Sequence, residues 1–251
     1  MIRVIDCGVM GFPDALRLQE KCVAAIDTGS DVETLLLVEH PPVYTIGTGG
    51  NGANLLDPKR PLIRTNRGGD ITWHGPGQLV GYPLVNLGER GRDLHCWLRF
   101  LEELLIRTAA EFGVSAWRIP GKTGVWAERG KLAAIGVGVR RWVTMHGFAL
   151  NVSPDLTEFS RINPCGIPGC PVTSLQQENG HPTELAEVKE HTKRIFRELL
   201  PECLPKEGRA VKAEIPDLLQ GQDSLKNLEV AGQGLCRDAL AVRLPERHYE
   251  L

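Results

Sequence analysis

The chain has 251 residues, of which 42% are apolar and 24% are charged, and this composition is that of a globular protein with one large domain or two small ones. Its 29 Lys and Arg residues against 31 Asp and Glu residues give a formal charge of −2, which excludes a general binder of nucleic acid or of anionic membranes. No apolar run approaches the roughly 20 residues that span a bilayer, and Asp6 and Pro13 interrupt the start of the chain, so we expect neither a secretion signal nor a membrane anchor.

The first third of the chain predicts several short strands and one helix. Residues 13–26 carry an apolar stripe at helical spacing, with Pro13 in the first turn and Gly29 beyond the end. The short apolar or alternating runs around this helix are typical of strands. Strands are expected at residues 2–7, 34–38, 43–46, 62–65 and 79–84.

The rest of the chain adds two helices and three successive strands. Residues 94–112 and 183–200 are amphipathic, and Gly113 follows the first of them. Strands are expected at residues 125–127, 132–139 and 142–150. Because several strands follow one another through short turns, the pattern predicts an α/β (α+β) domain with a single mixed sheet, over residues 1–204. Residues 205–251 are weakly patterned, and we expect a C-terminal extension packed on that domain.

Two glycine-rich segments resemble nucleotide-binding motifs, but the residues around them do not fit those motifs. Residues 47–52 match G-x-G-x-x-G, but Pro58 prevents the following segment from forming the helix that would hold a pyrophosphate. Residues 121–123 read Gly-Lys-Thr, but Ala116 stands where a phosphate loop needs its first glycine. Neither pattern therefore predicts a nucleotide site.

Residues 67–78 form the densest unusual segment, and they place an arginine, a histidine and a glutamine among glycines and a proline. Such a loop lets backbone N–H groups approach a ligand closely. The same features also fit a tight loop whose polar groups are satisfied locally. Residues 144–151 leave a similar choice, because His146 and Gly147 inside a strand fit either a ligand site or a structural histidine.

A lysine and two cysteines are candidates for covalent chemistry. Lys131 begins an apolar strand beside small residues, where it is either a base in a dry pocket or a solvated strand end. Cys165 lies between proline and glycine on a rigid turn, which presents a thiol as a nucleophile, and Cys170 is its local rival. The seven cysteines are irregularly spaced without C-x-x-C or zinc-ligand patterns, which indicates reduced thiols and a cytoplasmic protein.

Together these segments resemble one family, the octanoyltransferases of lipoate biosynthesis, also called lipoyl(octanoyl) transferases. The resemblance covers about residues 2–200. It rests on the segments 40–45 (HPPVYT), 67–78 (RGGDITWHGPGQ), 131–136 (KLAAIG), 146–151 (HGFALN) and 164–166 (PCG).

The resemblance implies a fold similar to the catalytic domains of biotin protein ligases and lipoate ligases. It implies transfer of an octanoyl group from octanoyl-acyl carrier protein to a lysine amine of lipoyl domains, those of the E2 subunits of 2-oxoacid dehydrogenases and of the glycine-cleavage H protein. No cofactor is implied, neither ATP nor a metal. Nucleic acid and membranes are not expected as partners.

The resemblance also implies residue roles. Cys165 is expected to carry the acyl group as a thioester, and Lys131 is expected to activate the thiol or take its proton. The acyl chain and thioester are expected to contact Arg67, Gly68, Gly69, Asp70, Ile71, Thr72, Trp73, His74, Ala134, Ile135, Gly136, Gly147, Phe148 and Ala149.

Two other functions remain open at this point. An ATP-dependent lipoate or biotin ligase would share the fold but would need a nucleotide site and would not need Cys165. A non-catalytic module that binds a carrier protein would need neither Cys165 nor Lys131. For an acidic carrier protein, a local basic patch is a hypothesis, the alternative being solvated strand ends; its residues would be Arg64, Arg67, Arg90, Arg92, Arg140 and Arg141.

Overall fold

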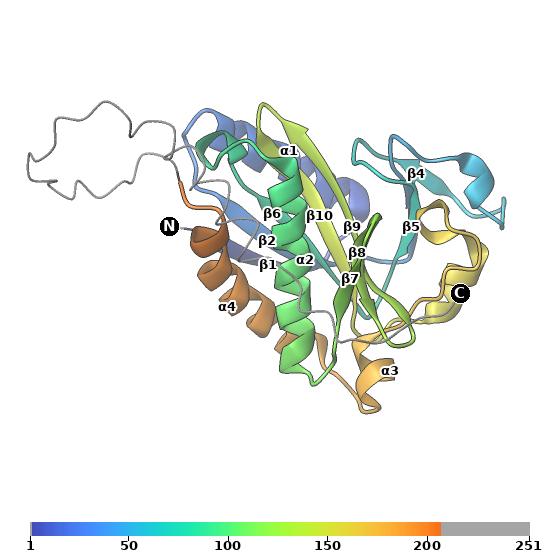
Figure 1. Ribbon diagram of the computed structural model, residues 1–251. Coiled ribbons are helices and arrows are strands. Elements are labelled where there is room, and N and C mark those ends of the chain that lie inside the picture. Colours follow the sequence, from blue (N-terminus) through green and yellow to red (C-terminus); the bar gives the residue numbers. More distant parts are fainter. Residues whose placement is uncertain (1, 207–251) are drawn as a thin grey trace, which may run out of the picture.

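The computed structural model describes residues 2–206, which form a seven-stranded mixed sheet with helices on both faces and a three-stranded sheet at one side (Figure 1). Strands β1 and β2 pair in parallel, and every other neighbouring pair of the large sheet is antiparallel. In spatial order its strands are β1 (Arg3–Val9), β2 (Thr34–Glu39), β6 (Gln78–Leu84), β10 (Val143–Asn151), β9 (Gly130–Arg140), β8 (Lys122–Ala127) and β7 (Trp117–Ile119).

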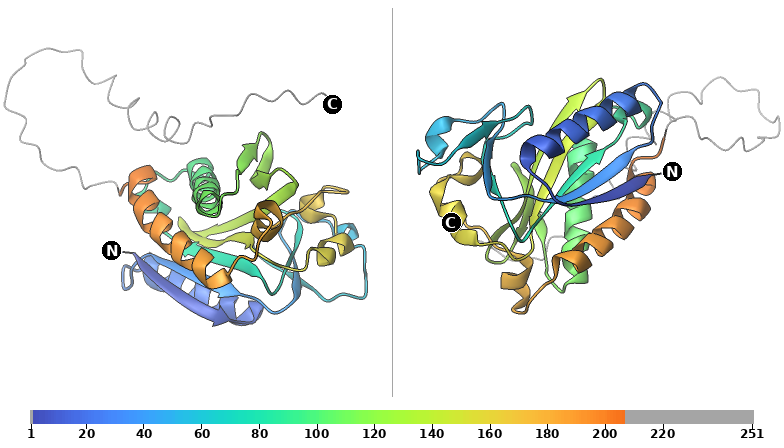
Figure 2. Two further views of the ribbon diagram at one scale, coloured as in Figure 1. Left: turned by 90° about the horizontal axis from the view of Figure 1, so that it is seen from below. Right: turned by 180° about the vertical axis from the view of Figure 1, so that it is seen from behind.

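Helices cover the two faces of the large sheet (Figure 2). Helix α1 (Phe12–Asp27) buries Ala15, Cys22, Val23 and Ile26 against one face. On the other face, α2 (Leu94–Glu111) and α4 (Leu185–Cys203) pack against each other and against the sheet. The carboxylate of Asp93 begins α2 by accepting hydrogen bonds from the N–H groups of the next turn, at 2.8 and 3.0 Å. The short helix α3 (Leu175–Asn179) precedes α4.

The small sheet has the order β4 (Leu62–Arg64), β3 (Val43–Ile46), β5 (Ile71–His74). Its own core joins Tyr44, Ile46, Ile71 and Trp73 to apolar side chains of the 3₁₀ turn η3 (Leu156–Arg161). Strand β5 corrects the sequence analysis, which treated residues 67–78 as a loop. The alternation of Ile71 and Trp73 with polar neighbours is only four residues long, and the glycines on both sides of it favoured a loop.

The other predicted elements are confirmed within a few residues of their bounds, and the short strand β7 and the short helix α3 are additional misses. Helix α4 continues past the predicted end to Cys203, with Pro201 in its last turn. Residues 207–251, nearly all of the predicted extension, lie outside the described residues. Within residues 2–206, no helix combines the length and the hydropathy needed to cross a bilayer.

Candidate active site

The amine of Lys131 meets the thiol of Cys165 where the two sheets adjoin. The Nζ–Sγ distance is 2.9 Å, and Nζ also donates to the backbone oxygen of Thr123 at 3.1 Å. Lys131 is 5% exposed, so the amine lies inside the protein. The structure therefore excludes the alternative that Lys131 is a solvated strand end.

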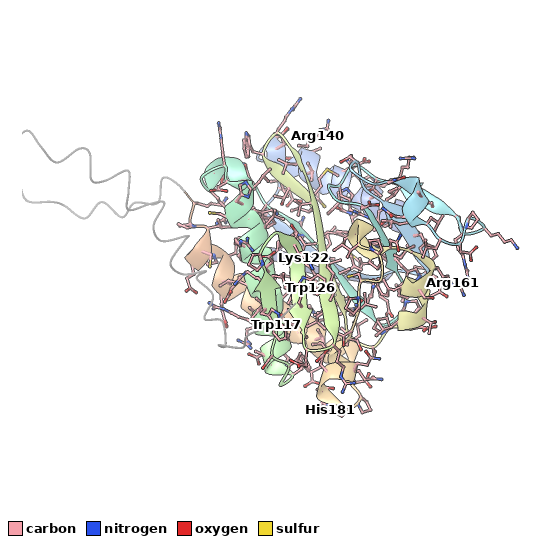
Figure 3. The ribbon with its side chains drawn as sticks, turned by 45° about the vertical axis from the view of Figure 1, so that its right-hand side comes forward. Trp117, Lys122, Trp126, Arg140, Arg161 and His181 are labelled. Atoms are coloured by element: carbon pink, nitrogen blue, oxygen red, sulfur yellow. The ribbon has the colours of Figure 1, made fainter. Side chains whose placement is uncertain are left out.

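The neighbouring strand β8 leaves room for this amine. A Cβ atom on Gly124 would lie 2.8 Å from Cε of Lys131, and the backbone there has φ +120°, which favours glycine. The ring of Trp126 packs beside the amine, with Nζ of Lys131 5.6 Å from its centroid, and Lys122 approaches the same ring (Figure 3). The sequence does not predict this pocket, because residues 121–123 suggest only a failed phosphate loop and residues 125–127 only a strand.

The thiol is presented by a single 3₁₀ turn, η4 (Pro164–Gly166). Cys165 itself has φ +57°, a left-handed conformation that costs a non-glycine residue on the order of 1–3 kcal/mol. Cys165 is half-buried and does not lie in a core. Because the fold maintains this strain at a thiol beside an amine, the position fits a nucleophile.

A cleft leads from Cys165 between the large sheet and the segments that cover it. Its floor consists of small and apolar side chains on three paired strands, since Ala149 of β10 lies between Val80 of β6 and Ala134 of β9. Phe12 of α1 and His74 of β5 cover the cleft, and their rings stack with an interplanar angle of 8°. The cleft can therefore take an apolar chain with its reacting end at the thiol.

Glycine in β9 allows the covering segment to approach. A Cβ atom on Gly136 would lie 3.0 Å from Cδ of Arg67 and 3.1 Å from the oxygen of Gly68. The N–H of Gly68 donates to the oxygen of Val137 at 2.7 Å, which ties the segment to the sheet. Gly136 is thus needed for packing of the protein against itself as much as for a ligand.

The polar side chains of the cleft are buried, and the imidazoles among them are held neutral. Arg67 is 8% exposed, and its guanidinium donates to Gly68 O, Thr45 O and Thr45 Oγ1 at 3.0–3.1 Å. Burial, with the Arg67 charge nearby, lowers the pKa of His146 to about 4. Burial likewise lowers the pKa of His74, with His40 and Arg67 contributing.

The comparisons with known proteins decide the family. Residues 12–197 match the family described as the lipoyl protein ligase A/B catalytic domain. The chain is 58% identical to the octanoyltransferase of Geotalea uraniireducens over 204 residues, which are 81% of this chain and 95% of that protein. It is 60% identical to the octanoyltransferase of Geobacter metallireducens over 205 residues, 82% of this chain and 95% of that protein.

The chain belongs to the octanoyltransferase family. It is therefore an enzyme, an acyltransferase of octanoyl or lipoyl groups, as the sequence analysis expected. Solved structures confirm the predicted fold. Lipoate-protein ligase A bound with ATP superposes with a TM-score of 0.62 at 17% identity, over 95% of this chain and 93% of that one. Protein Ta0514 of T. acidophilum, described as a lipoate protein ligase, superposes with a TM-score of 0.60 at 18% identity, over 79% of this chain and 84% of that one.

In this octanoyltransferase the structure brings together most residues predicted to bind the acyl group. Besides Cys165, the lining of the cleft includes Arg67, Gly69, Asp70, Ile71, Thr72, His74, Ala134, Ile135, Gly136, Gly147, Phe148 and Ala149. Trp73 departs from the prediction, because alternation along β5 turns it to the other face, into the core of the small sheet. Gly68 contacts β9 but is not among the lining residues. Sequence reasoning missed Phe12, Val80 and Tyr82 as lining residues. His146, for which it left a ligand site and a structural role open, lines the cleft and is also bonded to Asn66.

Cys170, the rival thiol, feels the charge of Lys131 but, unlike Cys165, has no hydrogen bond to its amine. Its Sγ lies 3.7 Å from the oxygen of Pro171, and burial raises its pKa. Burial alone would make this thiol a poorer nucleophile. The contact with Lys131 favours Cys165.

The basic patch considered from the sequence is smaller than expected. Arg90 is buried in an ion pair with Glu33, at 2.6 Å, and Arg67 covers the cleft, so neither can form part of a surface patch. Arg64, Arg92, Arg140 and Arg141 are exposed. Figure 3 shows Arg140 at the end of the β9–β10 hairpin.

No part of residues 2–206 offers a metal or phosphate-loop site. Among them, no group of three His, Cys, Asp or Glu side chains could hold a metal ion. Residues 47–52 lead only into a three-residue 3₁₀ turn, η1 (Gly52–Asn54), and Gly121 lies in the turn between β7 and β8. Neither segment therefore leads into the long helix that its nucleotide-binding motif requires.

Proposed function

We propose that the chain transfers an octanoyl group from octanoyl-acyl carrier protein to lipoyl domains through a thioester on Cys165. The observation that carries the proposal is the 2.9 Å contact between Nζ of Lys131 and Sγ of Cys165 at one end of an apolar cleft. A thiol that attacks a thioester needs a group to hold its proton, and the amine stands where that proton would go.

In the first half-reaction, Sγ of Cys165 attacks the carbonyl carbon of the octanoyl thioester. The new carbon–sulfur bond forms as the bond to the pantetheine sulfur of the carrier protein breaks. The proton that Sγ gives up passes to Lys131 and from there to the departing pantetheine sulfur. A thioester replaces a thioester, so the step is nearly balanced in free energy.

In the second half-reaction, the lysine amine of the lipoyl domain attacks the Cys165 thioester. Lys131 accepts a proton from the attacking amine, and Sγ of Cys165 leaves as the thiol is restored. Conversion of a thioester to an amide runs downhill, so the sequence of steps requires neither ATP nor a metal ion.

The acceptors in this proposal are the lipoyl domains of the E2 subunits of 2-oxoacid dehydrogenases and the glycine-cleavage H protein. For an acidic carrier protein, the exposed arginines that remain are candidates for docking. Arg92 and Arg140 lie near Trp142 at the β9–β10 turn, where the Arg92 guanidinium is 6.0 Å from the Trp142 ring centroid. Charge reversal at both arginines should raise the KM for the carrier protein in a salt-dependent way and leave kcat unchanged.

Mass spectrometry after incubation with octanoyl carrier protein tests the acyl-enzyme. We expect one octanoyl adduct on the peptide that contains Cys165, absent in Cys165→Ser and in Cys165→Ala. Cys170→Ser is the matched control and should keep the adduct. An adduct on Cys170 that survives Cys165→Ser would overturn the assignment.

The ATP requirement separates this proposal from a ligase. We expect an apo lipoyl domain to become octanoylated when octanoyl carrier protein is the donor and ATP is absent. Octanoylation that appears only with free octanoate and ATP would show a ligase instead. Tight binding of the carrier protein without any acyl transfer would show a carrier-binding module.

A further inference from the structure

Two consecutive residues of the turn that presents the nucleophile have left-handed backbone. Cys165 has φ +57° and Gly166 has φ +72°. Glycine adopts this conformation freely, whereas the Cβ atom of cysteine opposes it. Two hydrogen bonds close the turn, from Gly166 N to Asn163 O at 3.0 Å and from Ile167 N to Pro164 O at 3.1 Å. These bonds are internal to the turn, so they do not fix its place in the fold.

Asn54 of η1 fixes that place from outside. Its backbone oxygen accepts a hydrogen bond from the N–H of Asn163 at 2.8 Å. Its side-chain oxygen accepts a second one from Nδ2 of Asn163 at 3.3 Å. Asn54 therefore holds, by backbone and side chain together, the residue two positions before Cys165.

Asp70 completes the support. Nδ2 of Asn54 donates to Oδ2 of Asp70 at 2.7 Å, and Oδ1 of Asp70 accepts from the N–H groups of Ile71 and Asn51 at 2.6 and 3.3 Å. Gly166 rests on this amide–carboxylate pair, because a Cβ atom there would lie 2.9 Å from Oδ2 of Asp70 and 3.4 Å from Nδ2 of Asn54.

We propose that Asn54 and Asp70 are positioning residues that hold the Cys165 turn at the distance from Lys131 that acyl transfer requires. Lys131 is anchored by Thr123 O, by its own strand and by backbone hydrogen bonds with Pro171 and Thr173, which follow Cys165 in the chain. Those bonds hold the chain six or more residues beyond Cys165, so the 2.9 Å separation also depends on how the turn itself is held. Asp70 was expected to contact substrate, but both oxygens of its carboxylate accept hydrogen bonds from the protein.

This inference rests on the proposed acyl-enzyme, so its test measures the rate at which Cys165 is acylated. Octanoyl carrier protein is mixed with excess enzyme, and the adduct is followed in single turnovers by mass spectrometry. Asn54→Ala and Asp70→Ala should each lower the rate constant at saturating donor at least tenfold, with the half-saturating concentration unchanged within twofold. Because the two side chains act as one pair, the double variant should lose little more than either single variant.

Two further variants separate positioning from general loosening. Asp70→Asn keeps an acceptor oxygen of the same shape and should stay within threefold of the wild-type rate. Asn51→Ala is the matched control, because its side chain lies in the same turn but accepts only from the N–H of Ala53, at 3.0 Å. It should acylate at the wild-type rate.

The results that overturn the inference are distinct from those that overturn the proposed function. Wild-type rates in Asn54→Ala and Asp70→Ala would refute the positioning role, as would an equal loss in Asn51→Ala. A raised half-saturating concentration with an unchanged rate constant would make Asp70 a substrate contact. If Asp70→Ala does not fold, the rate constant and half-saturating concentration of Asn54→Ala test the positioning role instead. Absence of any Cys165 adduct in the wild-type chain would instead refute the proposed function.

Discussion

The buried imidazole of His146 predicts a specific loss of stability in mild acid. Burial and the nearby Arg67 charge lower its pKa from 6.5 to about 4 in the folded protein. Between these two values the unfolded chain binds a proton at this imidazole and the folded chain does not. Lowering the pH through this window therefore favours unfolding, and raising it restores stability. From pH 7.5 to pH 5.0 the loss from this one group is about 2 kcal/mol.

Urea denaturation at the two pH values measures this loss. With a slope of about 2 kcal/mol per M, the His146 contribution corresponds to a shift of about 1 M in the midpoint. His146→Asn removes the titrating group, and asparagine tolerates the left-handed backbone at this position, where φ is +56°. The pH-dependent loss should therefore shrink by about 2 kcal/mol in the variant. Part of the loss should remain, because burial also lowers the pKa of His40 and of His74.

His181→Asn is the control, because His181 is exposed on the loop between α3 and α4 (Figure 3). It should leave the pH dependence as it is in the wild type. If His146→Asn loses as much stability between pH 7.5 and pH 5.0 as the wild type does, the reasoning from burial is refuted.

Three further predictions concern the amine and the packing around the site. Lys131→Met should slow acylation of Cys165 by about 100-fold or more in single turnovers, because within residues 2–206 no other amine is bonded to the thiol, and an unchanged rate would remove Lys131 from the mechanism. Gly124→Ala should lower activity without removing Lys131, since the new Cβ atom would take the space of Cε at 2.8 Å; full activity would show that the amine has room to move. Glu33→Ala should destabilise the fold by about 3–5 kcal/mol in urea denaturation, because it leaves the Arg90 guanidinium buried and unpaired, and a loss below 1 kcal/mol would contradict this.

Much of the fold could be predicted from the sequence because its elements carry their own periodicity. Helix α2, with its apolar face and the Asp93 cap, is an example. Strand β5 could not be predicted, because four residues between glycines show too little alternation. Pairing with β3 defines it, and that pairing joins residues distant in the chain.

The candidate site, too, could be predicted only in part. The Cys165 turn could be recognised from its proline and glycine, which are local features. The burial of Lys131 could not, since it depends on Gly124 in the neighbouring strand and on a loop 34 residues away. The basic patch failed for the same reason, because Arg90 meets Glu33 across 57 residues.

The two groups of the candidate site, Lys131 and Cys165, are held by different sheets. Lys131 belongs to the large sheet, whereas the Cys165 turn is bonded through Asn54 and Asp70 to the small one. Backbone hydrogen bonds of Lys131 with Pro171 and Thr173 link the two sides and oppose a change in the sulfur–nitrogen gap. Under the proposed mechanism, the packing between the two sheets bears on the rate, and substitutions in the core around Trp73 and Phe159 should lower it although they touch no reacting atom.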